Sequence, residues 1–139
     1  MAPVPGNSSY ATSPAKVGQI VAFGLWLEKN TGSEAVIRSI EPAQRGLAKG
    51  LELRYAGVKA TSNCRVGALY GWPPPDCVGD LLPISGFRVP KGVEGGILVG
   101  ASATAPGHWL IRAFRIRYEV NGRSYETVYP QGLGLNVAD

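Results

Sequence analysis

The sequence predicts an all-β protein, and three features of the 139-residue chain indicate this class. Apolar and polar residues alternate in short segments, which is typical of strands that bury one face. Turn signals separate these segments at intervals of about 8–12 residues, and 19 Gly and 11 Pro supply many of them. No segment shows a convincing helical period. We therefore expect an immunoglobulin-like β-sandwich of seven or eight antiparallel strands.

The clearest element is a β-hairpin over residues 108–129. Its turn, Val-Asn-Gly-Arg at 120–123, suits a two-residue type I′ turn, in which both central residues need positive φ. This turn fixes the pairing of the two strands. One face is then charged, with Arg117 opposite Glu126, while the other is aromatic and β-branched and should lie on a core. The aromatic face contains Phe114, Ile116, Tyr118, Val120, Tyr125, Thr127 and Tyr129.

The first strand of this hairpin changes the parity of its apolar residues. Trp109 and Ile111 occupy odd positions, whereas Phe114 and Ile116 occupy even positions. One extra residue near Arg112 would place all four side chains on the same face. The parity change therefore predicts a β-bulge.

The other expected strands are shorter and bounded by turn residues. The first covers 16–27, with Val17 among its inward residues, and the second covers 35–40, before Pro42. Residues 81–89 form an irregular stretch. Further strands are expected at 51–58 with a bulge at Gly57, at 64–70 with Cys64, Val66, Ala68 and Tyr70 inward, at 97–103, and at 133–137.

The two ends of the sequence differ in composition. Residues 1–14 are rich in Pro, Ser, Asn and Gly, so we expect a flexible arm there and a single sandwich domain over 15–139. The start lacks the charged and apolar regions of a signal peptide. No segment reaches the roughly 18 apolar residues of a membrane helix.

Cys64 and Cys77 are the two cysteines of the chain. Their spacing fits no common zinc pattern, so a disulfide is the favoured interpretation, with a stabilisation of about 3 kcal/mol. A disulfide implies an oxidising compartment, and hence an extracytoplasmic protein, secreted or membrane-anchored. We therefore expect a signal or anchor ahead of Met1. The alternative is a cytosolic protein with two buried thiols.

The composition argues against several kinds of site. The net charge of +4 comes from scattered residues rather than a basic stripe, so we expect no nucleic-acid partner. His108 is the single histidine and follows a turn, where a solvated side chain is the simpler interpretation. No nucleophile elbow or phosphate loop occurs. We expect no catalytic residue, no metal and no cofactor, although acid pairs can form among ten carboxylates.

The run from Tyr70 to Pro75 is the candidate binding site. Pro73, Pro74 and Pro75 favour an extended polyproline II segment, and Tyr70 or Trp72 beside it could dock a protein or a sugar ring. The alternative is that Trp72 folds back to cap one end of the sandwich, with the disulfide holding the loop.

Four motifs occur in a fixed order: Gly71-Trp72-Pro73-Pro74-Pro75, Gly86-Phe-Arg-Val-Pro-Lys-Gly92, Gly96-Ile-Leu-Val-Gly100 and Tyr118-Glu-Val-Asn-Gly-Arg-Ser-Tyr125. Over residues 50–138 this pattern resembles a group of uncharacterised actinobacterial proteins, in which a membrane helix precedes a small extracytoplasmic β-domain. The resemblance implies an exterior domain tethered through a segment outside this sequence. It implies no activity and no functional residues.

These observations favour a non-enzymatic extracytoplasmic domain that binds a partner or serves as a spacer at a cell surface. A protein or a cell-surface glycan is the expected partner. One alternative is a hydrolase of the cell wall or its glycans that uses a carboxylate pair. Another is a subunit of a virion or surface layer, which would self-associate.

Overall fold

The computed structural model describes residues 9–26, 33–43, 50–59, 68–77, 79–91 and 96–138. This part of the chain forms twelve strands, one 3-10 turn (η1) and no α-helix, which confirms the all-β sandwich. The strand number exceeds the seven or eight expected because β1, β6 and β7 are additional strands and the first strand of the long hairpin divides into β9 and β10. The immunoglobulin-like type stays a prediction.

The elements are β1 Ser9–Lys16, β2 Val21–Trp26, β3 Ala35–Pro42, β4 Leu51–Val58, β5 Ala68–Tyr70, η1 Pro75–Cys77, β6 Leu81–Pro83, β7 Arg88–Val89, β8 Gly96–Ala103, β9 Gly107–Ile111, β10 Phe114–Val120, β11 Arg123–Tyr129 and β12 Gln131–Ala138.

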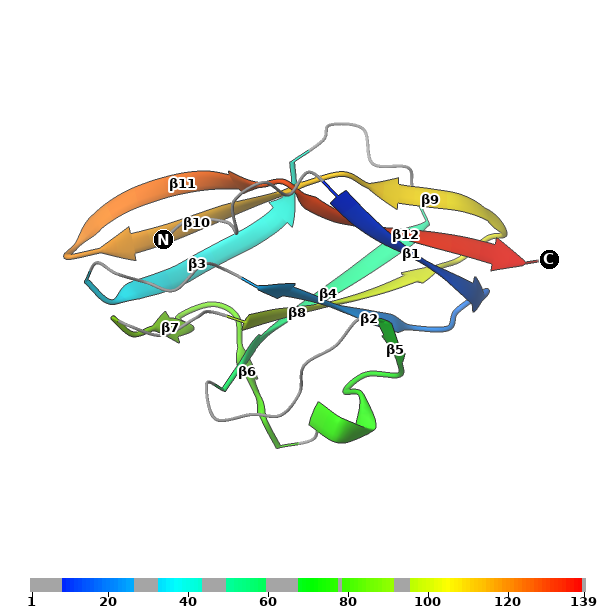
Figure 1. Cartoon of the computed structure of the whole chain (residues 1–139), viewed down its shortest axis with the longest axis horizontal. Helices are drawn as coiled ribbons and strands as arrows, with labels where there is room; N and C mark the ends of the chain where they lie inside the picture. Colours follow the sequence, from blue (N-terminus) through cyan, green and yellow to red (C-terminus); the bar gives the residue numbers. More distant parts are fainter. Residues whose placement is uncertain are drawn as a thin grey trace.

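The strands form three sheets arranged in two layers (Figure 1). One layer is a five-stranded sheet in the order β5-β2-β8-β4-β6. The opposite layer contains a four-stranded sheet, β11-β10-β3-β7, and a three-stranded sheet, β1-β12-β9. The chain passes directly from β9 to β10 and from β11 to β12, so one long two-stranded ribbon runs through both sheets of this layer.

The register of the β10–β11 hairpin confirms the sequence prediction. Val120 pairs with Arg123, Tyr118 with Tyr125, and Phe114 with Tyr129. The turn residues Asn121 and Gly122 have φ values of 51° and 76°. Two consecutive positive φ values define a type I′ turn, whose twist matches that of the flanking strands.

The parity change near Arg112 marks the place where the ribbon passes from one sheet to the other. Ile111, at the end of β9, and Phe114, at the start of β10, are both fully buried. The intervening residues Arg112 and Ala113 belong to neither strand. On the opposite strand Gly132 lies against the Ile111 carbonyl, where an added Cβ would collide with the backbone. The predicted irregularity is therefore a break between two sheets rather than a one-residue bulge.

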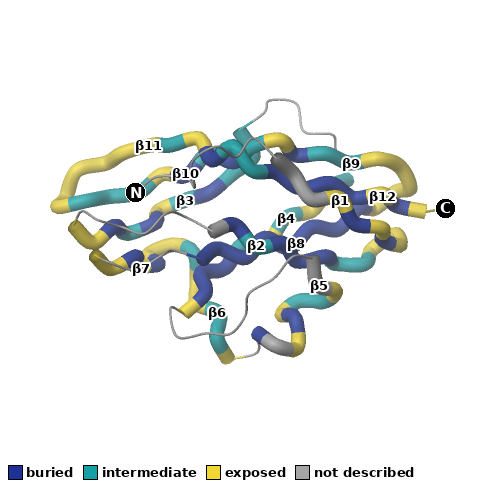
Figure 2. Tube along the Cα trace, viewed as in Figure 1, coloured by how far each residue is buried: buried dark blue, intermediate teal, exposed yellow. Residues whose placement is uncertain are grey.

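The main core lies between the two layers (Figure 2). Phe114, Ile116 and Tyr129 from the ribbon face Ile97 and Val99 of β8, and all five are fully buried. Tyr55 packs edge-on against Phe114, with ring centroids 6.3 Å apart. Burial, with a smaller effect of Glu41, raises the pKa of Tyr55 to about 12. Leu133, Leu135 and Val137 of β12 are also buried, as their alternation predicts.

The expectation of a flexible arm over residues 1–14 is wrong for residues 9–14. These residues form most of β1, which pairs in parallel with β12, Ser9 with Gln131 and Lys16 with Ala138. A short polar segment can form a strand here because the central strand β12 offers backbone hydrogen-bond partners. A strong apolar pattern is therefore not required. Residues 1–8 lie outside the described residues.

Two inward positions and one predicted bulge also differ from the sequence prediction. Val17 is 47% exposed because the chain turns between β1 and β2, where Gly18 has a φ of 78°. Tyr70 is 45% exposed. Gly57 marks no bulge, since the pairing of β4 with β8 is continuous, and an added Cβ there would overlap the Phe87 ring. This glycine serves close packing instead.

Cys77 is fully buried and is not a free cysteine. Its expected partner, Cys64, lies outside the described residues, as does Val66, so the Cys64–Cys77 pairing stays a prediction. In the part of the chain that the structure describes, no helix is long and apolar enough to cross a membrane.

Candidate functional site

The predicted binding loop packs on the outer face of the five-stranded sheet. Trp72 is partly buried against a small cluster formed by Ala22, Val58, Cys77 and Leu98. Its ring lies over Gly100 of β8, where an added Cβ would come within 2.6 Å of the indole Cε3. Trp72 therefore folds back as in the alternative interpretation, although it covers a sheet face rather than an end of the sandwich.

The neighbouring residues of the loop separate rather than form one surface. Pro74 is buried, Pro73 is exposed, and Pro75 begins the 3-10 turn η1, so the three prolines do not form one polyproline II segment. The Tyr70 hydroxyl donates a hydrogen bond of 2.8 Å to the Pro14 carbonyl. Because Pro14 lies in β1 and Tyr70 in β5, this bond ties the two layers together at one edge.

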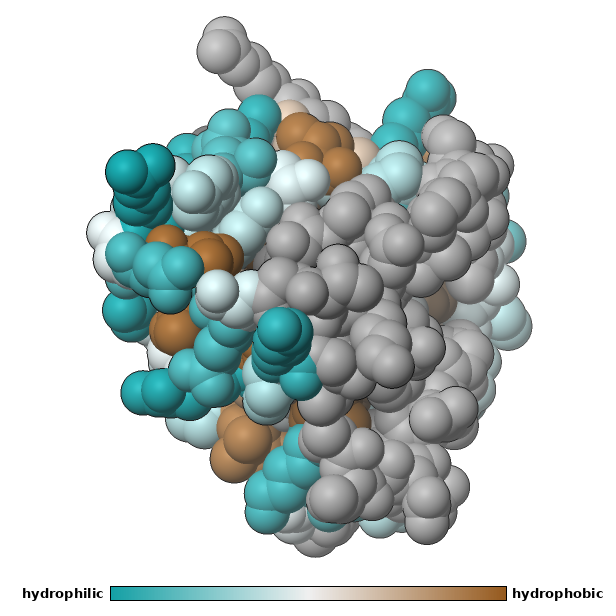
Figure 3. Space-filling view, turned by 60° about the vertical axis from the view of Figure 1, so that its left-hand side comes forward, coloured by the Kyte–Doolittle hydropathy of each residue, from teal (hydrophilic) through white to brown (hydrophobic). Residues whose placement is uncertain are grey.

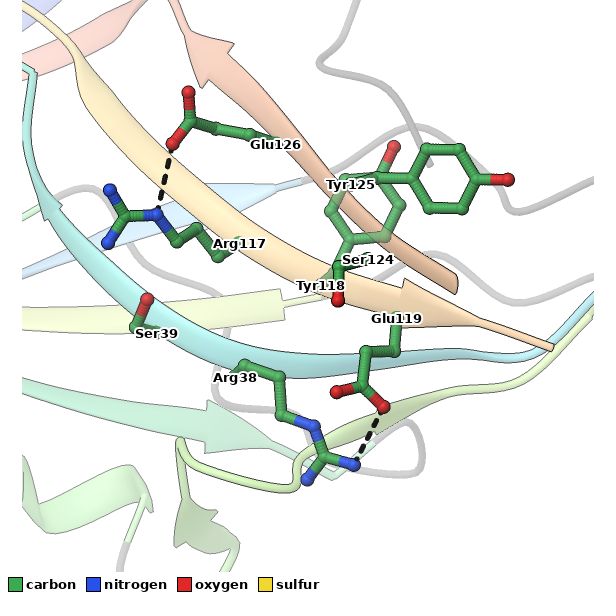
Figure 4. Close-up of a pocket in the computed structure, with 8 residues that line it drawn as sticks. All are labelled: Arg38, Ser39, Arg117, Tyr118, Glu119, Ser124, Tyr125 and Glu126. Atoms are coloured by element: carbon green, nitrogen blue, oxygen red, sulfur yellow. Dashed lines mark hydrogen bonds and ion pairs between the residues drawn. The ribbon is translucent and has the colours of Figure 1, made fainter. Parts of the chain in front are cut away.

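A second surface, on the sheet that contains the hairpin, carries more polar side chains than the Trp72 loop. A groove of about 500 Å³ lies across β3, β10 and β11, and we call it the hairpin groove (Figure 4). The side chains on its outer face are Arg38, Ser39, Arg117, Glu119, Ser124 and Glu126. The four of these residues that lie in β10 and β11 alternate with residues of the aromatic face, which the confirmed hairpin register places on the opposite side.

A bulge in β3 supplies one of these side chains. Arg117 pairs with Ser39, but the next residue, Tyr118, pairs with Ile37, so Arg38 is the extra residue. Such a bulge redirects side chains. The Arg38 guanidinium reaches the Glu119 carboxylate, with Nη2 3.0 Å from Oε2.

The other charges of this face form a connected set of ion pairs. Arg117 Nε lies 3.0 Å from Glu126 Oε1, as the sequence register predicts. Arg115 Nε lies 3.6 Å from the same oxygen. Both arginines also approach Glu41, at 3.5 Å from Arg115 and 3.6 Å from Arg117. Each carboxylate is thus shared by two guanidinium groups, which holds all four side chains across the face.

The electrostatic consequences are clearest at the bulge. The hydrogen bond from Arg38 lowers the pKa of the Glu119 carboxyl below its usual 4.5. The same contact raises the pKa of Arg38. Glu119 is therefore ionised near neutral pH, where it does not serve as a proton donor.

Tyr118 and Tyr125 also belong to the lining of the groove, and the hairpin register places their rings on the aromatic face. Their rings stack with centroids 5.6 Å apart and an interplanar angle of 20°. Figure 4 shows both rings beside each other and turned away from the Arg117–Glu126 pair. Burial, together with the neighbouring Tyr125 hydroxyl, raises the pKa of Tyr118. Tyr125 itself is 45% exposed, although the sequence pattern places it toward a core.

The chemistry of the groove is that of a polar contact surface. Guanidinium groups and serine hydroxyls donate hydrogen bonds, while carboxylates and hydroxyls accept them. In the described ranges no group of three or more His, Cys, Asp or Glu residues could hold a metal ion. His108 is exposed at the start of β9 and lies outside the groove lining.

Comparison with known proteins adds little to this picture. The fold and the groove define a class of protein, a β-sandwich with a polar groove on one sheet. No family model matches the chain, and no curated protein matches it. Among solved structures the chain is similar to a family 123 glycoside hydrolase from Clostridium perfringens, studied for glycolipid glycan hydrolysis, with 9% identity and a TM-score of 0.43. The match spans 92% of this chain but 22% of that one. Such a likeness establishes no activity here.

Proposed function

We propose that the chain is a non-enzymatic extracytoplasmic module that binds an uncharged, polar ligand, a cell-surface glycan, in the hairpin groove. The observation that carries this proposal is the balance of charge in the groove, whose lining includes two arginines and two glutamates. These charges are paired with each other, so the groove offers no net charge to attract an anion or a cation. It offers many fixed hydrogen-bond donors and acceptors, which suit the hydroxyl groups of a sugar.

The pairing of the groove carboxylates Glu119 and Glu126 with arginines supports binding over hydrolysis. A glycoside hydrolase with two carboxylates needs one whose pKa is raised, so that it can protonate the leaving group. Glu119 has a lowered pKa because of Arg38. Glu126 is engaged by two guanidinium groups, those of Arg115 and Arg117.

The buried, non-free Cys77 supports an oxidising compartment, and hence the extracytoplasmic location. A domain of this kind could stand alone or be tethered. The proposed function requires only that the groove face a surface rich in glycans.

Titration calorimetry of the purified protein against a panel of neutral bacterial polysaccharides tests the proposal. We expect binding that weakens at least about tenfold in Arg117→Ala, since one charge-assisted hydrogen bond contributes about 1.5–3 kcal/mol. Arg88→Ala is the matched control, because Arg88 also forms an exposed ion pair, 2.8 Å from Glu34, but lies outside the groove lining. Equal losses in both variants, or turnover of a glycan that Glu126→Gln abolishes, would contradict the proposal.

A further inference from the structure

We infer that a second copy of this chain pairs in antiparallel orientation with the outer edge of β11, so that two four-stranded sheets join into one. This inference goes beyond the proposed function and does not depend on the ligand of the hairpin groove. It rests on the position of β11, on its exposed residues and on the complementarity of the strand with itself.

The strand β11 lies at the end of its sheet and, within the described residues, pairs only with β10. In a hairpin with a two-residue type I′ turn, the residues that flank the turn form a hydrogen-bonded pair, and here these residues are Val120 and Arg123. Such pairs alternate along an antiparallel ladder with pairs whose backbone groups point away from each other. The N–H and C=O groups of Ser124, Glu126 and Val128 therefore point away from β10, toward the outer edge of the sheet.

Most of this strand is exposed, from Arg123 to Glu126 and again at Val128 (Figure 2). Tyr125 is 45% exposed and Val128 is 49% exposed, and both lie in this seven-residue strand. In a view turned toward this side of the molecule, hydrophobic residues form separate small patches among hydrophilic ones (Figure 3). An open edge with exposed large side chains is a template for pairing with another strand.

The sequence of β11 fits a copy of itself in one register. With the two-fold axis at Tyr125, this residue faces its counterpart in the second copy, and Ser124 faces Glu126. The serine hydroxyl can then donate a hydrogen bond to the carboxylate, and this contact occurs twice. Each Tyr125 is already stacked on its own Tyr118, so the arrangement extends the stack across the interface.

The competing register is less favourable. A two-fold axis at Glu126 would place two carboxylates directly opposite each other, and like charges across a ladder are destabilising. A polar peptide lacking an aromatic residue would leave Tyr125 uncovered. The strand is therefore more complementary to itself than to an arbitrary extended segment, which is why we assign the edge to a second copy.

Pairing at this edge would also place two hairpin grooves side by side. Ser124 and Glu126 line the groove, and in the joined sheet they would face each other across the two-fold axis. One dimer would present a polar face of double length, and two grooves on one rigid sheet increase avidity for a repeating ligand.

Site-specific crosslinking and sedimentation of the full chain test the inference. In Tyr125→Cys, the two introduced thiols should meet at a pair without backbone hydrogen bonds, where Cα atoms lie about 4.5 Å apart and a disulfide can form. We expect a covalent dimer on mild oxidation in this variant. Ser124→Cys alone should give none, while a mixture of Ser124→Cys and Glu126→Cys proteins should crosslink. A dimer of Ser124→Cys alone, or none in Tyr125→Cys, would overturn the register.

Analytical ultracentrifugation over a range of concentrations tests whether dimerisation depends on the outward backbone N–H groups of β11. Ser124→Pro removes an outward N–H without touching the β10–β11 ladder, so it should weaken dimerisation at least about tenfold. Ser124→Ala keeps the N–H and should leave most of the association intact. Circular dichroism verifies that both variants fold. If the unmutated chain stays monomeric at every concentration and Tyr125→Cys does not crosslink, the inference is wrong.

Discussion

The two halves of the long ribbon share one sequence pattern but have different surroundings. In β10–β11 the inward residues are buried at Phe114 and Tyr129, whereas Tyr125, near the turn, is exposed. In β9–β12 the inward residues Leu133 and Leu135 are fully buried. The strand β12 is central, with β1 on one side and β9 on the other, while β11 is an edge strand.

The difference teaches that alternation predicts which face a residue occupies, but not whether that face is covered. Coverage depends on how far the opposite layer extends. The turn end of β10–β11 is aromatic like its base, yet Tyr118 and Val120 there are only partly buried against the core cluster, and Tyr125 is exposed. The open part of the ribbon is therefore available for contacts, and the covered part determines stability.

The largest expected effect separates the base of the hairpin from its open end. Phe114→Ala should lower the free energy of unfolding by about 3–5 kcal/mol, because it leaves a cavity among fully buried neighbours. Tyr125→Ala, on the same face, should cost less than about 1 kcal/mol. Chemical denaturation of both variants measures the difference. Similar losses would mean that the two ends are covered alike.

A second comparison is within β12. Gly132→Ala should destabilise the fold by about 2–3 kcal/mol, because the new Cβ meets the backbone of Ile111 and Arg112, which cannot rotate away. Gly134→Ala should cost clearly less, since the nearest atom is the Thr12 hydroxyl oxygen at 3.0 Å, on a side chain that can move. Thermal unfolding of both variants checks the order. The reverse order would contradict the close approach at the sheet break.

Substitutions in the turn between β10 and β11 should change the free energy of unfolding less than those at Phe114 or Gly132. Gly122→Val should cost at least about 1 kcal/mol, because a β-branched residue resists the φ of 76°. Gly122→Asn should be tolerated better, since asparagine adopts positive φ more readily. Urea unfolding distinguishes the two, and a neutral valine variant would argue against the type I′ turn.

The smallest expected effect concerns Glu119, whose side chain is partly exposed. Its pKa is lowered by Arg38, so the folded state favours the ionised form. The contribution to stability is therefore present above the usual pKa of 4.5 and is lost as the pH falls through the lowered value in the folded state. Carboxyl NMR titration should show the lowered pKa, and Arg38→Gln should return it toward the usual range. An unchanged pKa in the variant would remove Arg38 as the cause.

The sequence predicts the local structure of this protein better than its long-range pairing. The Asn121-Gly122 turn fixes the whole hairpin register because turn geometry and alternation are local properties. The parity change near Arg112 likewise marks the break between sheets. In contrast, the strand β1 has few apolar residues and forms by pairing with β12 at the far end of the chain, which no local pattern reveals.

The hairpin groove was only partly accessible from the sequence. Arg117 and Glu126 are paired through the hairpin register, and this pair was predicted. Arg38 and Glu41 come from β3, and Arg38 reaches Glu119 only because a bulge displaces the register of β3 against β10. The residues of the expected site around Trp72 do not form one surface, because Trp72 covers the apolar outer face of β8 at Leu98 and Gly100.

The parallel pairing of β1 with β12 has a mechanical consequence. Ser9 lies beside Gln131, and Lys16 lies beside Ala138, so the chain enters this strand pair at one end and leaves it at the other. A force that pulled Ser9 and Ala138 apart would slide the two strands past each other along their length. All the hydrogen bonds of the ladder would then bear the load together, instead of opening one after another as in a zipper. A domain stretched between these two points would resist extension through its terminal strands before its core was strained.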